Sequence, residues 1–138
     1  MELKPLQIGD LTIKYPIIQG GMGVGISRSS LAGAVSANGG LGIISSAQIG
    51  YDEPDFDKDQ NQANLNAIYK HIQKAKEISG GKPVGINIMV ALKNYEAHVK
   101  ASIEAGADVI ISGAGLPVHL PEYVNGSGCK IAPIVSSE

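Results

Sequence analysis

The sequence contains no tryptophan, one phenylalanine and one cysteine among its 138 residues. A core without large aromatic side chains must be built from aliphatic residues and alanine. The one cysteine, Cys129, excludes an intramolecular disulfide framework and is typical of a protein of the reducing cytoplasm. At this length the chain forms one domain at most.

Long apolar runs and basic runs are also missing. No stretch approaches the roughly 20 apolar residues of a membrane span, and the N-terminus lacks the apolar segment of a signal peptide. The net charge is −2, without the clustered lysines and arginines of a nucleic-acid-binding surface. We therefore expect a cytoplasmic protein without membrane or nucleic-acid partners. Nothing in the composition opposes a homo-oligomer.

Common nucleotide and metal motifs are incomplete or absent. Gly21, Gly23 and Gly25 do not have the spacing of a dinucleotide-binding fingerprint, and the sequence has no P-loop. The histidines are too far apart in sequence to predict a metal site. We expect His71 and His98 to lie on the solvated sides of helices.

What the sequence does contain is a repeated junction between an apolar run and a glycine-rich or polar end. It occurs at residues 16–23, 41–46, 84–89 and 109–115. In the first junction, Ile17 and Ile18 predict a buried strand. The glycines after them permit positive φ and close backbone approach. A strand that ends in bare backbone is a suitable seat for a flat, polar cofactor.

Strands and helices alternate along the chain. The pattern predicts a hairpin at residues 6–13, strands at 17–19, 41–45, 84–89, 108–112 and 131–135, and helices at 27–38, 65–78, 95–103 and 117–123. Residues 48–61 are acidic and aperiodic, which indicates a long surface loop. Near-continuous isoleucine and valine runs favour an α/β fold with a covered parallel sheet.

Two architectures fit this pattern, a doubly wound sheet and a (β/α)₈ barrel. A complete barrel needs about 250 residues, so under the second alternative we expect the N-terminal part of a longer protein. The opening hairpin resembles a plug under the barrel floor.

In both architectures ligands bind at the carboxyl ends of the strands. The residues expected there are Gln19, Gly21, Met22, Gly23, Ser45, Ser46, Asn87, Met89, Ser112, Gly113 and Gly115. They are mostly small or amide-bearing, so the site suits a neutral heterocycle better than hydrolytic chemistry. Asn87 lies in an apolar strand, where a buried amide needs a partner, and we interpret it as a ligand contact.

Five motifs in order carry a family resemblance. They occupy residues 16–22, 31–36, 39–44, 83–89 and 112–117. Together they resemble the nitronate monooxygenase family, formerly the 2-nitropropane dioxygenases, which includes the flavin-dependent enoyl-acyl-carrier-protein reductases. The match covers nearly the whole chain except the acidic segment, which looks like an insertion.

The resemblance implies that residues 1–138 are the N-terminal part of an FMN-binding TIM-barrel domain, about five parallel strands preceded by a β-hairpin, with an acidic loop insertion at about 48–61. FMN would lie at the C-terminal mouth of the barrel. By motif position, backbone of the glycine turn would contact the flavin ring and Asn87 would bond its polar edge. The residues so assigned are Gly21, Met22, Gly23, Ser46, Asn87, Ser112 and Gly113.

The implied activity is that of an FMN-dependent oxidoreductase, a nitronate monooxygenase that oxidises alkyl nitronates with O₂. The alternatives are an enoyl-acyl-carrier-protein reductase that uses NAD(P)H, and a catalytically inert fragment that lacks the second half of the barrel. The family's catalytic histidine lies in a Gly-Gly-His stretch, which this sequence does not contain. No catalytic residue is therefore assigned, and the role is not transferred to His71, His98 or His119.

Overall fold

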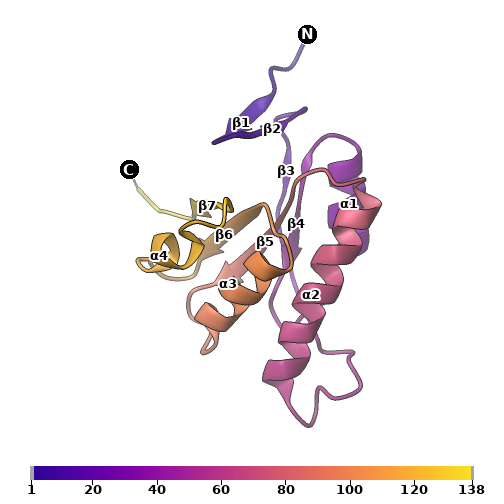
Figure 1. Cartoon of the computed structure of the whole chain (residues 1–138), viewed down its shortest axis with the longest axis vertical. Helices are drawn as coiled ribbons and strands as arrows, with labels where there is room; N and C mark the ends of the chain where they lie inside the picture. The colour runs from indigo at the N-terminus through magenta and orange to yellow at the C-terminus, as the bar shows by residue number, and fades with distance from the viewer. Residues whose placement is uncertain (1, 138) are drawn as a thin grey trace.

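The computed structural model describes residues 2–137, as a two-stranded hairpin followed by alternating strands and helices (Figure 1). The elements are β1 (Leu6–Ile8), β2 (Leu11–Ile13), β3 (Ile18–Gln19), α1 (Ser29–Ala37), β4 (Leu41–Ser45), α2 (Gln60–Ile78), β5 (Val84–Met89), α3 (Tyr95–Glu104), β6 (Val109–Gly113), α4 (Leu120–Val124) and β7 (Lys130–Pro133).

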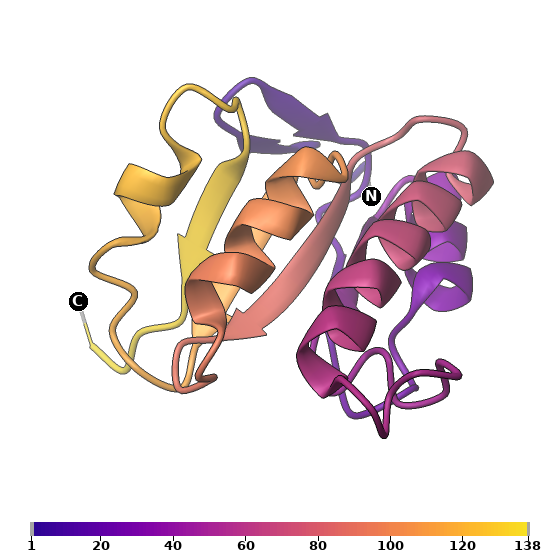
Figure 2. The same ribbon diagram turned by 60° about the horizontal axis from the view of Figure 1, so that its bottom comes forward.

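The five later strands form one parallel sheet in the order β3-β4-β5-β6-β7, each bonded to the next strand in the sequence. Figure 2 shows the helices over one face of this curled sheet and the hairpin at the end where the strands begin. A doubly wound sheet would reverse its strand order and carry helices on both faces. The fold is therefore part of a TIM barrel, five parallel strands preceded by an antiparallel hairpin.

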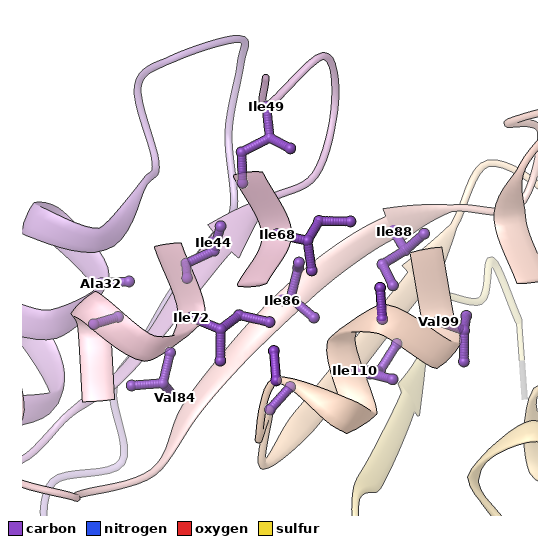
Figure 3. Close-up of a cluster of buried hydrophobic side chains, with 14 of the residues drawn as sticks. Ala32, Ile44, Ile49, Ile68, Ile72, Val84, Ile86, Ile88, Val99 and Ile110 are labelled. Atoms are coloured by element: carbon purple, nitrogen blue, oxygen red, sulfur yellow. The ribbon is translucent and has the colours of Figure 1, made fainter. Parts of the chain in front are cut away.

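Hydrophobic side chains fill both faces of the sheet because successive strand residues point in opposite directions. Ile44, Ile86 and Ile110 pack under the helices, against residues such as Ile72 of α2 and Val99 of α3 (Figure 3). On the other face a second cluster joins the strands to the hairpin. It contains Ile13, Leu41, Ile43 and Val109, flanked by Leu6, Ile8, Leu11 and Ile111. This packing confirms the hairpin as a plug at the floor of the curled sheet.

A glycine brings α1 close to the sheet. A Cβ atom built on Gly42 of β4 would lie 1.9 Å from the carbonyl oxygen of Ala32. The backbone N–H of Gly42 also donates to the Ser36 hydroxyl at 2.9 Å. The helix can pack this tightly only because β4 carries no side chain at that position.

Most predicted elements are present with small differences at their ends. Helix α2 begins at Gln60, earlier than the periodicity predicts, because the Asp59 carboxylate caps it by accepting from the N–H of Gln62 at 3.0 Å. Residues 60–61 of the predicted acidic loop therefore belong to α2. None of the helices in residues 2–137 is long and apolar enough to span a membrane.

Two predictions of burial are wrong. Ile17 and Ile18 are 56% and 46% exposed, because β3 is an edge strand that pairs only with β4. His71 and His98 were expected in solvent and are instead only 8% and 4% exposed. His71 is covered by α1, where the Ser29 hydroxyl lies 3.0 Å from its Nδ1 atom.

Candidate functional site

The glycine turn after β3 rests directly on the carboxyl ends of β4 and β5. A Cβ atom on Gly21 would lie 2.9 Å from the carbonyl oxygen of Ile44 and 3.0 Å from the Cβ atom of Asn87. Gly23 and Gly25, with φ of 67° and 74°, then turn the chain toward α1. The turn thus presents backbone rather than side chains beside the strand ends.

Gln19 and Ser27 hold this turn in place. The Gln19 carboxamide continues the strand ladder beyond β3: its Oε1 accepts from the N–H of Ile43 at 3.2 Å, and its Nε2 donates to the Ile43 carbonyl at 3.1 Å. The Ser27 hydroxyl accepts from the N–H of Met22 at 3.0 Å and lies 3.3 Å from the carbonyl oxygen of Gly20. Both residues are structural supports of the turn.

Sequence reasoning missed these supporting roles. Gln19 was expected at the ligand face, and Ser27 is the first residue of the helix predicted over residues 27–38. The available signal for Gln19 was a carboxamide at the last position of a short strand, since such a side chain can replace a backbone amide in the ladder.

Asn87 links the turn to the sheet and retains a free polar atom. The side-chain Nδ2 of Asn87 donates to the Gly21 carbonyl at 3.3 Å. The backbone carbonyl of Asn87 accepts from the N–H of Ser46 at 3.1 Å. The Oδ1 atom of Asn87 and the hydroxyl of Ser46 are buried without hydrogen-bond partners. Buried polar atoms without partners are rare in native proteins and point to a ligand or water that satisfies them.

Ser112 faces the helix layer. Its hydroxyl donates to the Ile88 carbonyl at 3.0 Å and lies 2.7 Å from the phenol oxygen of Tyr95 on α3. Burial raises the pKa of Tyr95, so this phenol stays neutral. The hydroxyl of Ser112 is therefore already committed to the packing of α3 on β6.

The remaining predicted residues lie at the same edge of the sheet. Gly113 is the register partner of Met89, and both end their strands. Met22 is 67% exposed and Gly23 is also exposed. The strand ends thus bring together Gly21, Asn87, Ser46 and Gly113, while Met22 lies on the outer side of the turn.

None of the predicted site residues carries a charge, and burial shifts the pKa of two histidines and the cysteine elsewhere in the chain. Burial lowers the pKa of His71 and of His98, both in the helix layer. It raises the pKa of the Cys129 thiol to about 11, so this cysteine is not an activated nucleophile. Within residues 2–137 no group of three or more histidine, cysteine or acidic residues could hold a metal ion. The site can offer hydrogen bonds and flat backbone but no general base.

Comparison with known proteins is consistent with this geometry. The family model for nitronate monooxygenase matches residues 4–137. The structure of FabK from Thermotoga maritima is similar, with 30% identity and a TM-score of 0.71 over 91% of this chain and 35% of that chain. A point variant of the same FabK gives 31% identity and a TM-score of 0.74, over 91% of this chain and 37% of that chain.

A more distant structure shares the fold. Nitroalkane oxidase from Streptomyces ansochromogenes is 17% identical, with a TM-score of 0.70 over 88% of this chain and 40% of that chain. No curated protein sequence matches significantly. The chain spans well under half the length of the solved structures it matches. From the family match over nearly its full length, the chain belongs to the nitronate monooxygenase family.

Proposed function

We propose that this chain supplies part of the FMN site of a flavin-dependent oxidoreductase, at the carboxyl ends of β3 to β6. The observation that carries the proposal is the unpartnered Oδ1 atom of Asn87, buried beside the bare backbone of Gly21. A flat heterocycle can lie against a glycine backbone and bond an amide through its polar edge.

The residues present suit the flavin ring. Its polar edge carries carbonyl oxygens and one N–H, which match the free acceptor of Asn87 and the free hydroxyl of Ser46. The predicted site residues are uncharged, as a neutral ring requires. When bound, FMN supplies reversible two-electron oxidation and reduction.

Each predicted residue then has a role in binding. Gly21, Met22 and Gly23 offer backbone against the ring, and Asn87 orients its edge. Preorganised donors at that edge favour negative charge that develops there. We assign Ser46, Gly113 and the backbone of Ser112 to the lining of the pocket. The hydroxyl of Ser112 instead positions the end of β6 through Tyr95.

For the whole protein we propose nitronate monooxygenase activity, the oxidation of alkyl nitronates with O₂. The similarity to FabK, at 30% and 31% identity, favours a second candidate, enoyl-acyl-carrier-protein reduction with NAD(P)H. The predicted site residues provide no proton-transferring group. This shortage supports the third alternative, that the chain by itself is a catalytically inert fragment.

The test supplies the FMN-loaded protein with propyl nitronate and O₂, and separately with crotonyl thioester and NADH. Oxygen consumption with the nitronate alone supports the monooxygenase. NADH consumption only with the thioester would sink that assignment in favour of the reductase. Turnover with neither substrate pair, together with no flavin absorbance in the purified chain, would identify the chain by itself as inert. Cytoplasmic location and oligomeric state stay predictions.

A further inference from the structure

A second polar cavity lies between the N-terminal ends of α2 and α3. Its volume is about 150 Å³. Figures 1 and 2 both show these two helix ends next to each other at the same end of the molecule. The lining residues are Gln48, Gln60, Asn61, Asn64, Leu92, Lys93, Asn94 and His98, none of which belongs to the proposed FMN site.

Two carboxamides at this cavity use their oxygen atoms in hydrogen bonds with other carboxamides. Asn94 donates through its Nδ2 to the Oδ1 of Asn61. Asn64 donates in the same way to the Oε1 of Gln48 at 3.5 Å. Because these bonds use the side-chain oxygens of Asn61 and Gln48, their NH₂ groups remain available to a ligand.

One cationic side chain and two helix N-termini lie at the cavity. The two helices have 19 and 10 residues, and the N–H groups of their first turns favour an anion. Lys93 lines the cavity, and no carboxylate of residues 2–137 pairs with it. The carboxylates nearby in sequence are already engaged, since Asp59 caps α2 and Glu96 pairs with Lys100.

His98 provides an independent sign of a ligand. Its side chain lines the cavity, the residue is only 4% exposed, and its Nδ1 atom is buried without a hydrogen-bond partner. A buried ring nitrogen without a partner needs an explanation, and a molecule in the adjoining cavity would supply one.

We propose that this cavity binds a small oxyanion of the phosphate or carboxylate class, held by Lys93, His98 and the NH₂ groups of Gln48 and Asn61. A metal cation is the wrong ligand because the ammonium and the two helix N-termini would repel it. An engineered cavity of about this volume accommodates benzene, so a phosphate or a small carboxylate fits.

The test is an NMR titration of the isotope-labelled chain with sodium phosphate and, separately, sodium acetate at constant ionic strength. We expect a saturable shift of the His98 imidazole signals with at least one anion. Lys93→Gln should weaken the apparent affinity about tenfold, because one charge-assisted hydrogen bond is lost. Lys74→Gln removes the same charge from an exposed site on α2 and should bind as the wild type does.

Three results would overturn the proposal. They are the absence of a saturable shift with both anions, equal affinity in the Lys93→Gln variant, and a shift on replacing sodium by potassium. Each can be read without flavin. Because the two sites share no residue, failure here leaves the proposed FMN site untouched, and failure to bind FMN leaves the oxyanion site standing.

Discussion

At the scale of single residues, both the fold and the proposed site depend on the absence of a Cβ atom at Gly21. Gly21→Ala places a methyl group against the Ile44 carbonyl, and we expect a loss of about 1–3 kcal/mol in the free energy of unfolding. Gly20→Ala is the matched control, because its nearest contact is the Met22 side chain at 4.0 Å. Urea denaturation of both variants is the measurement, and equal stability would contradict the close approach.

His98 makes stability depend on pH in a defined direction. Burial lowers its pKa, so the folded chain binds fewer protons than the unfolded chain. Its contribution is complete above the ordinary histidine pKa of about 6.5 and is lost as the pH falls through the lower, folded pKa. His98→Gln should therefore reduce the acid-induced fall in unfolding free energy. The measurement is urea denaturation at pH values above and below the ordinary histidine pKa of about 6.5. An identical fall in unfolding free energy in wild type and variant would refute the role of His98.

At the scale of elements, the acidic segment, residues 48–61, is tied to α1 by one ion pair. Arg28 at the N-cap of α1 donates to both carboxylate oxygens of Asp52, at 2.8 and 2.9 Å, and stacks 5.2 Å from the ring centre of Tyr51. The Arg28 guanidinium also holds the pKa of Asp52 below its ordinary value.

Asp52→Asn should loosen this segment without unfolding the domain. We expect faster amide hydrogen exchange in residues 50–58, with a change of at most about 1 kcal/mol in global stability, since the pair is partly exposed. Hydrogen-exchange mass spectrometry measures these exchange rates. Asp57→Asn is the control for removing an acidic charge from the same segment. Equal exchange rates in the two variants would argue against the tether.

The sequence predicts elements well where periodicity and end signals agree. The isoleucines of β4 and β5 and the apolar stripe of α2 define their elements without further help. Exposure is harder, because it depends on which neighbour covers a face. Thus Ile18 looks buried but lies at a sheet edge, and His71 looks solvated but meets Ser29 of α1.

The site is predictable in place but only partly in detail. The carboxyl ends of parallel strands meet at one edge, so Asn87 and Gly21 could be placed together from the sequence. Which face of the sheet each side chain points to decides the other contacts of the site. Ser112 contacts Tyr95 in the helix layer, and Gln19 contacts the backbone of Ile43. Only the packed structure defines these two contacts.

At the scale of the whole molecule, the chain is a curled sheet with a plugged floor and an open upper edge. The hairpin closes the end where the strands begin, through Ile13 against Leu41 and Val109. The chain covers 35–40% of the length of the structures it resembles. At the open edge, the free polar atoms of Asn87 and Ser46 meet the bare backbone of Gly21.

FMN binding at this open edge can be measured by titrating the purified chain with FMN and following the quenching of flavin fluorescence. We predict saturable binding that weakens about tenfold in Asn87→Ala, from the loss of one hydrogen bond. Asn66→Ala, an exposed asparagine on α2, should bind FMN as the wild type does. No binding by the wild-type chain, or equal affinity in Asn87→Ala, would contradict the account.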